Sequence, residues 1–258
     1  FAHGFQLQLA AYDLLLEHLA SWGYVVVSTD YPGSLFSIDH NDVAKALTAT
    51  RAAMAAGSIA GLPKVGKTAA AGHSLGGKGA LMAALSDASF VAVLGFDPVD
   101  GIPGNPLGGT PDAAHPQLAP TETAKLAIPV GYFGATQSHC GSQACAPTGL
   151  DAAALFAATP ASIPRYLWTA FDVGHMQFLD NPSCGFTCSV CAAAASAIRS
   201  SGAGQKLASA DQRRASSMSD ATSAASGSIT RHASSYRPAS ASSRARRMSF
   251  SGVIRQAF

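Results

Sequence analysis

Short apolar runs that alternate with helical patterns constrain the fold more than any other feature of this sequence. Mostly apolar runs of strand length occupy residues 24–28, 67–72, 90–96, 128–133 and 165–171. Between them, leucines recur at helical spacing over 9–19, and 43–56 is rich in alanine. Strands that alternate with helices form parallel sheets with both faces covered. The sequence therefore predicts an α/β fold with a mostly parallel sheet flanked by helices.

The charged residues divide the chain into two parts. Residues 1–196 carry seven Lys and Arg against thirteen Asp and Glu, whereas 197–258 carry ten against two. From residue 200 the sequence is mostly Ser, Ala and Arg, and it cannot bury enough apolar surface to offset the entropy lost on ordering. We therefore predict an α/β domain over 1–199 and a disordered low-complexity tail over 200–258.

Two segments of the first part depart from regular alternation. Six prolines between residues 98 and 127 predict a long loop over one end of the sheet. Residues 1–4 have the pattern of a strand end, so we expect the strands that would precede it to be missing from this chain. No uninterrupted apolar run reaches eighteen residues, so we expect a chain that is soluble or peripherally attached to a membrane.

The pentapeptide Gly72-His73-Ser74-Leu75-Gly76 fits the pattern G-x-S-x-G. An apolar run enters it and a helical segment leaves it, which is the strand-turn-helix context of a nucleophile elbow. Its glycines permit a tight turn that exposes the serine hydroxyl beside a helix N-terminus. Ser74 is the predicted nucleophile. The alternative is a Gly-rich turn in which Ser74 only caps the helix.

A nucleophilic serine needs a histidine that accepts its proton. His175 is the predicted base, because it follows the last apolar run in a loop that also contains Gly174. The other histidines after Ser74 lie in the Pro-rich loop, in a Cys/Gly loop and in the tail, at His115, His139 and His232. A solvated loop histidine is the alternative interpretation of His175.

A carboxylate must orient that histidine. Many enzymes of this arrangement carry it after the run that corresponds to 128–133, but here residues 134–138 contain no carboxylate. The orienting carboxylate is therefore expected after the preceding apolar run, 90–96, at Asp97 or Asp100. Asp97 is preferred, because it comes directly off the run and Pro98 restricts the backbone beside it. Capping of a turn by Asp97 is the alternative.

Backbone donors complete the predicted site. His3-Gly4-Phe5 is a turn at the end of the first strand. The N–H groups of Phe5 and Leu75 are expected to point at the oxygen that becomes negative during acyl transfer. They would form the oxyanion hole.

Residues Gly61 to Thr68 match the phosphate-binding pattern G-x-x-x-x-G-K-[ST] and support the strongest rival interpretation, a nucleotide-binding module. A phosphate loop follows a strand and opens a helix, whose N-terminal amides bind the anion. Here a predicted helix precedes the segment and a predicted strand follows it, so a nucleotide-binding module is disfavoured.

Cysteines leave several interpretations open. Five are present, at Cys140, Cys145, Cys184, Cys188 and Cys191. The C-x-x-C of Cys188 and Cys191, with the pair at 140 and 145, could form a Cys₄ zinc site, but disulfides or free thiols fit as well. We predict no catalytic metal, no cofactor and no nucleic-acid partner.

Four blocks of sequence resemble the chlorophyllases of plants and green algae. His3-Gly4-Phe5, with the Leu-rich stretch over 14–27, is similar to the family's HGF and following segment. Residues 72–77 resemble its G-H-S-R-G-G, with Leu75 where plant members usually have arginine. Residues 95–101 are similar to its G-x-D-P-V-x-G, and 172–180 resemble its D-x-G-H-x-D-M-L-D.

The resemblance spans about residues 1–192. It implies an α/β-hydrolase fold, a triad of Ser74, Asp97 and His175, a chlorophyll or related phytylated tetrapyrrole as substrate, and a chloroplast location. The expected function is therefore hydrolysis of the phytyl ester of chlorophyll to chlorophyllide and phytol. Alternatives are a lipase, cutinase or polyester-type hydrolase, and a hydrolase-fold binding protein that has lost catalysis.

Overall fold

A parallel sheet forms the centre of the described chain. The computed structural model describes residues 1–33, 38–101, 110–138, 145–181 and 254–256. Four strands pair in parallel in the order β2-β3-β4-β5. Ala2 bridges in parallel to Thr29 of β1 and to Gly72 of β2, so the first residues of the chain lie between these strands. The strands are β1 (Val27–Thr29), β2 (Thr68–His73), β3 (Phe90–Phe96), β4 (Val130–Ala135), β5 (Arg165–Ala170) and β6 (Ile254–Gln256).

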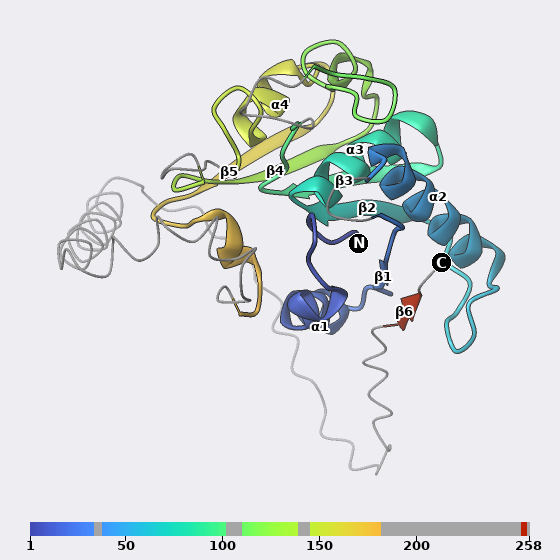
Figure 1. Ribbon diagram of the computed structural model, residues 1–258. Coiled ribbons are helices and arrows are strands. Elements are labelled where there is room, and N and C mark those ends of the chain that lie inside the picture. Colours follow the sequence, from blue (N-terminus) through green and yellow to red (C-terminus); the bar gives the residue numbers. More distant parts are fainter. Residues whose placement is uncertain (34–37, 102–109, 139–144, 182–253, 257–258) are drawn as a thin grey trace, which may run out of the picture. The chain divides into compact units, whose positions relative to one another are not determined.

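Helices cover both faces of this sheet. Figure 1 shows α2, α3 and α4 on one face and α1 on the other. The α-helices are α1 (Asp13–Ser21), α2 (His40–Ala56), α3 (Leu75–Ser86) and α4 (Ala152–Ala158). Short 3-10 helices are η1 (Leu9–Tyr12), η2 (Thr123–Lys125) and η3 (His175–Phe178). The predicted α/β fold with a mostly parallel sheet is therefore confirmed.

Local sequence accounts for the ends of α2. The side chain of Asp39 accepts a hydrogen bond from the N–H of Asn41 at 2.8 Å, which satisfies a donor that the first turn leaves free. Gly57 ends the helix in the left-handed conformation, at φ 72°, where glycine carries no Cβ penalty. Asp151 caps α4 in the same way as Asp39, by accepting from the N–H of Ala154.

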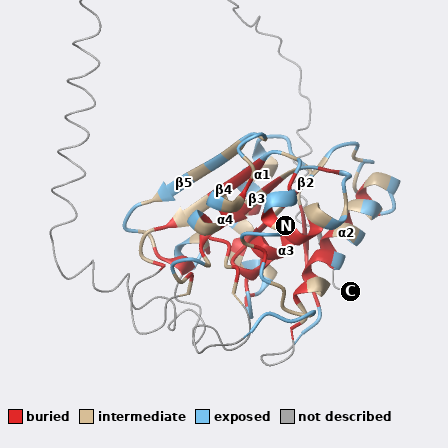
Figure 2. Ribbon diagram, turned by 90° about the horizontal axis from the view of Figure 1, so that it is seen from above, coloured by how far each residue is buried: buried red, intermediate tan, exposed pale blue. Residues whose placement is uncertain are grey.

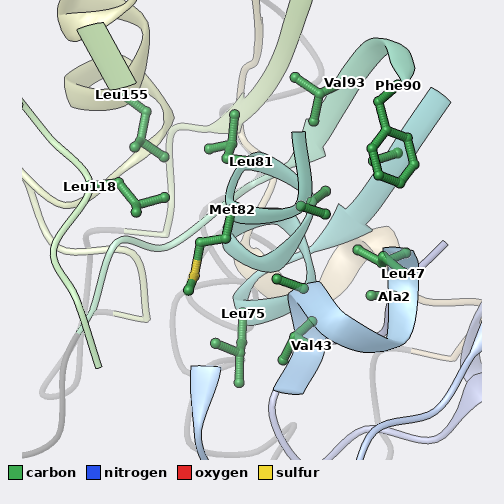
Figure 3. Close-up of a cluster of buried hydrophobic side chains, with 14 of the residues drawn as sticks. Ala2, Val43, Leu47, Leu75, Leu81, Met82, Phe90, Val93, Leu118 and Leu155 are labelled. Atoms are coloured by element: carbon green, nitrogen blue, oxygen red, sulfur yellow. The ribbon is translucent and has the colours of Figure 1, made fainter. Parts of the chain in front are cut away.

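The helix α3 lies at the centre of the fold and is buried on all sides over residues 75–83 (Figure 2). Its first two turns are rich in Gly and Ala, so neighbouring backbones approach closely. An added Cβ at Gly79 would lie 2.2 Å from Cγ1 of Val43 on α2. Figure 3 shows how Leu75, Leu81 and Met82 of α3 pack with Val43 and Leu47 in the larger core.

A second core fills the opposite face of the sheet. It joins Phe1 and Phe96 to Tyr12 and Leu16 of η1 and α1, and to Met176 of η3. Aromatic rings dominate it, since Phe1 and Tyr12 have centroids 4.9 Å apart and Phe96 stacks on Phe133 at 5.2 Å. This packing anchors the segments that carry residues 1–5 and residue 175 to the sheet.

The sequence located all five strands of the first part. The run 90–96 has the observed bounds, and the others shift by one to three residues at an end. Helix α4 was not predicted, because 152–158 is a short Ala-rich stretch without a clear apolar period. Among the described residues, no helix is both long and apolar enough to span a bilayer.

The tail differs from expectation at one place. Residues 254–256 form β6, which pairs in parallel with β1, whereas disorder was expected over 200–258. The remainder of the predicted tail lies outside the described residues.

The contact of Gly79 with Val43 gives a test of α3 packing. Gly79→Ala is expected to destabilise the protein by about 1–2 kcal/mol in urea unfolding, because overpacking outweighs the gain in helix propensity. The loss should be smaller in a Val43→Ala background. Gly66→Ala is the control, since no atom lies within 4 Å of a Cβ there. Equal losses in both glycine variants would contradict this packing.

Candidate active site

The nucleophile elbow forms where β2 turns into α3. Ser74 has φ 56° and ψ −121°, a backbone conformation that residues other than glycine rarely adopt. An added Cβ at Gly72 would lie 2.3 Å from the carbonyl of Gly76, and one at Gly76 would lie 2.2 Å from the carbonyl oxygen of Ala2. Only glycine fits at these two positions, so the G-x-S-x-G pattern is a steric requirement of the turn.

Strand register brings Asp97 beside Ser74. In the β2–β3 pair, His73 lies opposite Phe96, so the next residue on each strand is Ser74 or Asp97. The carboxyl ends of parallel strands share one edge of a sheet, and the two side chains leave the sheet at that edge. The N–H of Ser74 donates to the carbonyl of Phe96 at 3.0 Å and locks this arrangement.

His175 connects the two residues. Its Nε2 lies 2.9 Å from Oγ of Ser74, and its Nδ1 lies 2.6 Å from Oδ2 of Asp97. All three side chains are buried, with 9%, 1% and 3% of the surface of Ser74, Asp97 and His175 exposed. The structure thus brings together the three residues selected from the sequence. A hydroxyl, an imidazole and a carboxylate in this order can transfer a proton from the serine.

Asp97 is held by three donors. Besides Nδ1–H of His175, Oγ–H of Ser138 donates to Oδ2 and the N–H of Ala135 donates to Oδ1 at 3.0 Å. Burial alone would raise the pKa of Asp97, but the hydrogen bonds and charge of His175 and the hydrogen bonds of Ser138 and Ala135 outweigh it. The pKa of Asp97 is therefore below its usual value, and the carboxylate is ionised at neutral pH.

Sequence reasoning missed Ser138. The segment 134–138, which includes the last two residues of β4, was noted only for its lack of a carboxylate. The structure shows that this segment supports the Asp97 carboxylate with a serine hydroxyl and a backbone N–H. A serine at the carboxyl end of the strand next to the acid was the available signal. It became meaningful only once β3 and β4 were known to be neighbours.

Unusual backbone conformations gather at this edge. In the described part of the chain, the residues other than glycine with positive φ are Gln6, Ser74, Asp97 and Asp172, at 55°, 56°, 41° and 59°. Two of them are triad members, and the others lie in the turn after Phe5 and in the loop before His175. Each such conformation costs about 1–3 kcal/mol and persists where the surroundings hold it. The site is strained in all four of its segments.

The turn after Ala2 and the start of α3 each carry one free backbone donor. The N–H of Leu7 donates to the carbonyl of Gly4 at 3.1 Å and closes the turn. An added Cβ at Gly4 would lie 3.2 Å from Cβ of Ser74, so this turn abuts the nucleophile. In the described part of the chain, the N–H groups of Phe5 and Leu75 donate to no protein acceptor. Both remain free for a ligand oxygen.

His3 contacts this turn through its side chain. Its Nδ1 lies 2.8 Å from the carbonyl oxygen of Gly4, and its Nε2 lies 2.9 Å from Oδ1 of Asp30. Its ring stacks on Tyr31 with centroids 4.2 Å apart, and the hydroxyl of Tyr31 donates to the carbonyl of His3. His3 therefore ties the turn to Asp30 and Tyr31.

Asp100, the rival acid, has a different role. It is fully buried, and it accepts from the N–H groups of Leu118 and Ala119 at 2.8–2.9 Å. Nζ of Lys78 on α3 lies 3.3 Å from Asp100 and donates to the carbonyl of Gly101. Burial raises the pKa of Asp100 and lowers that of Lys78, and their attraction opposes both shifts. The pair ties the loop that follows Asp97 to the elbow helix.

The remaining candidates lie away from the triad or outside the described residues. His115 contacts Asp112 and the carbonyl of Ile38 instead of Ser74. The segment 61–68 lies between α2, which ends at Ala56, and the start of β2, so it lacks the strand-loop-helix order of a phosphate loop. His139, His232 and the other cysteines lie outside the described residues. Cys145 is disulfide-bonded.

Comparison with known proteins identifies the family. The model described as Chlorophyllase matches residues 1–210, which include the whole predicted domain. The chain belongs to the chlorophyllase family. Its α/β fold and the four motif blocks agree with this membership, and the resemblance seen in the sequence is confirmed.

Curated plant chlorophyllases are the relatives found. Chlorophyllase-1 of Arabidopsis thaliana is 31% identical over 202 residues, and Chlorophyllase-2 of the same plant is 27% identical over 199. The protein named "Chlorophyllase-1, chloroplastic" of Citrus unshiu is 29% identical over 191 residues. These matches cover 71–72% of this chain and 56–60% of the relatives. The chain therefore spans a little over half of the length of each relative.

Removal of the Ser138 hydroxyl tests the support of Asp97. Ser138→Ala should lower kcat/KM for a p-nitrophenyl ester by about 10-fold, because a hydrogen bond to a charged group is lost. The pKa of Asp97 should rise at the same time. Ser86→Ala is the matched control, since the Ser86 hydroxyl bonds to Ala83 on the outer end of α3. Wild-type kcat/KM in Ser138→Ala would contradict the support role.

Acid stability tests the buried histidines. Burial and the neighbouring His175 lower the pKa of His73 to about 3, and burial with the charges of Lys78 and His115 lowers that of His40 to about 3. In an unfolded chain histidine titrates near ~6.5, so below that pH the unfolded state binds more protons. As the pH is lowered below this value, the free energy of unfolding should then fall by about 1.4 kcal/mol per pH unit for each of these two histidines.

Urea unfolding at several pH values between about 6.5 and 4.5 measures how steeply the free energy of unfolding depends on pH. His73→Gln should remove about half of this dependence, since one of the two buried groups is gone. His18→Gln is the control, because His18 is exposed. An unfolding free energy that does not change over this range would show that these histidines are protonated in the folded protein.

Proposed function

We propose that this chain is a serine carboxylesterase that hydrolyses the phytyl ester of chlorophyll, releasing chlorophyllide and phytol. The observation that carries the proposal is the placement of His175 between Ser74 and Asp97, at 2.9 and 2.6 Å. Family membership directs the proposal to the substrate, since the matched relatives are named chlorophyllases. A chloroplast location is proposed on the same basis, from the names of the Citrus relatives.

Acylation begins with the hydroxyl of Ser74. Nε2 of His175 takes its proton while Oγ attacks the carbonyl carbon of the propionate ester. Asp97 holds Nδ1–H, so Nε2 is the free basic nitrogen, and its negative charge stabilises the imidazolium that forms. The N–H groups of Phe5 and Leu75 bind the negative oxygen of the tetrahedral intermediate. The imidazolium then protonates the leaving phytol oxygen, and the C–O bond breaks.

Deacylation repeats the same steps with water. His175 removes a proton from a water molecule that attacks the chlorin acyl group on Ser74. The second tetrahedral intermediate then collapses to chlorophyllide, while the imidazolium returns its proton to Oγ of Ser74. Side chains and backbone groups of this chain carry each proton and charge in this sequence. The proposal therefore includes no cofactor and no metal at the site.

Apolar side chains near the triad fit a large apolar ester. Phe5 is 38% exposed and belongs to the turn that carries the oxyanion donor. Phe171 is 78% exposed and follows β5 in the loop that leads to His175. Large exposed aromatic side chains beside a reactive group favour apolar ligands. Exposed aromatic side chains in these two segments suit both the chlorin ring and the phytyl chain, and they also suit peripheral contact with a membrane.

The decisive experiment uses chlorophyll as a detergent dispersion, p-nitrophenyl butyrate and triolein as parallel substrates. The wild-type protein should form chlorophyllide, and Ser74→Ala should lower this activity by at least about 10⁴-fold. Ser86→Ala should retain it. Hydrolysis of the small ester or triolein without chlorophyllide would instead show a lipase- or cutinase-type enzyme.

A fluorophosphonate probe separates an enzyme from an inactive relative. Wild-type protein should be labelled at Ser74, because the probe forms a covalent adduct only with an activated serine. The Ser74→Ala variant provides the background. Absence of labelling in the wild-type protein would contradict esterase function and favour a binding protein that keeps the hydrolase fold.

A further inference from the structure

His73, the residue before the nucleophile, makes a set of contacts that the reaction steps above do not use. Its side chain is fully buried. The pattern G-x-S-x-G allows any residue at this position, so the pattern alone does not explain a histidine. Its Nδ1 lies 2.8 Å from the hydroxyl of Tyr12, and its Nε2 lies 3.0 Å from the carbonyl oxygen of His175. One ring therefore contacts both η1 and the first residue of η3.

The direction of each hydrogen bond follows from the groups involved. A carbonyl oxygen only accepts, so Nε2 of His73 carries the hydrogen and donates to His175. In a neutral ring Nδ1 is then bare and accepts from the hydroxyl of Tyr12. The oxygen of Tyr12 in turn accepts from the N–H of Gly4 at 3.0 Å. A single directed chain thus runs from Gly4 through Tyr12 and His73 to the backbone of His175.

The surroundings keep His73 neutral. It is fully buried, its ring centroid lies 4.6 Å from that of His175, and Phe178 packs on it at 5.7 Å. Burial, followed by the neighbouring His175, lowers the pKa of His73 to about 3. A charged ring here would leave the hydroxyl of Tyr12 without an acceptor. It would also oppose the positive charge that His175 acquires during the reaction.

We propose that His73 is a positioning residue that holds the oxyanion turn and the general base in register with Ser74. This inference rests on the proposed esterase function. At one end, Tyr12 occupies the N–H of Gly4, which leaves the next N–H, that of Phe5, as the free donor at the turn. At the other end, the bond to the carbonyl of His175 fixes the main chain from which the imidazole reaches Ser74 and Asp97.

This role differs from simple core filling. If His73 only filled space, any ring of similar size could replace it. If it carries the chain of hydrogen bonds, its replacement must be neutral and must have both a donor and an acceptor. Glutamine meets the second requirement, and leucine meets neither. The two substitutions therefore separate hydrogen bonding from packing.

Kinetics of variants tests the proposal. His73→Leu should lower kcat for p-nitrophenyl butyrate by about 100-fold, with KM within about twofold, because displacement of catalytic groups affects the transition state more than binding. His73→Gln should recover at least about tenfold of this loss. The rate of labelling of Ser74 by a fluorophosphonate should fall in parallel with kcat. Equal losses in both variants, or wild-type kcat in His73→Leu, would overturn the proposal.

A double-mutant cycle tests the connection through Tyr12. Tyr12→Phe should lower kcat in the wild-type background and have little further effect in His73→Leu, since the chain is already broken. Tyr132→Phe is the matched control, because it removes another buried hydroxyl, which bonds to Thr159 on the far side of the sheet. Additive effects of Tyr12→Phe and His73→Leu would contradict the connection.

A spectroscopic measurement decides the tautomer without relying on activity. In ¹⁵N-labelled wild-type protein, the His73 ring should show a protonated Nε2 and a bare Nδ1, unchanged between about pH 5 and 8. A protonated Nδ1, or titration of this ring in that range, would overturn the proposal even in an active enzyme. Loss of all esterase activity and labelling in the wild-type protein would instead reject the proposed function.

Discussion

The close approach of the first residues of the chain to the elbow is the constraint on which the site depends. The carbonyl oxygens of Ala2 and His3 lie 2.2 and 2.4 Å from where a Cβ of Gly76 would stand. Because glycine alone fits there, the elbow and the turn at Gly4 are held against each other. This contact holds the turn at Gly4 beside the segment that carries Ser74.

Buried polar groups surround this contact, and most of them act through hydrogen bonds to the backbone. Asp97 accepts from Ala135, Asp100 from Leu118, and His73 donates to His175. A buried polar group is costly unless it is paired, so each bond also fixes the loop that supplies its partner. The hydrogen bonds that offset the cost of burying these polar groups therefore also set the geometry of the loops. The strained conformations at Ser74 and Asp97 persist inside this network.

Prediction from the sequence succeeded where a single residue type met a strict local requirement. The glycines of the elbow, the strand ends before Ser74 and Asp97, and the placement of His175 after the last strand were all visible as local patterns. It failed where a role arises from contact between distant segments. Ser138 and Tyr12 are ordinary residues by pattern, and only the pairing of β3 with β4 and the packing of η1 on the second core bring them to Asp97 and His73.

The sequence by itself determined the fold class, the order of the elements and the sharp turn that carries Ser74, because apolar periodicity and steric demands at glycine act within a few residues. The tertiary structure decided between Asp97 and Asp100 as the partner of His175, and it excluded a phosphate loop at 61–68. Both carboxylates follow the same strand, and the local pattern only favoured Asp97; the contacts that each side chain makes in the fold separate their roles. Asp100 turns toward Lys78 and Asp97 toward His175 because charge pairing and burial are settled by which helices and loops cover the sheet.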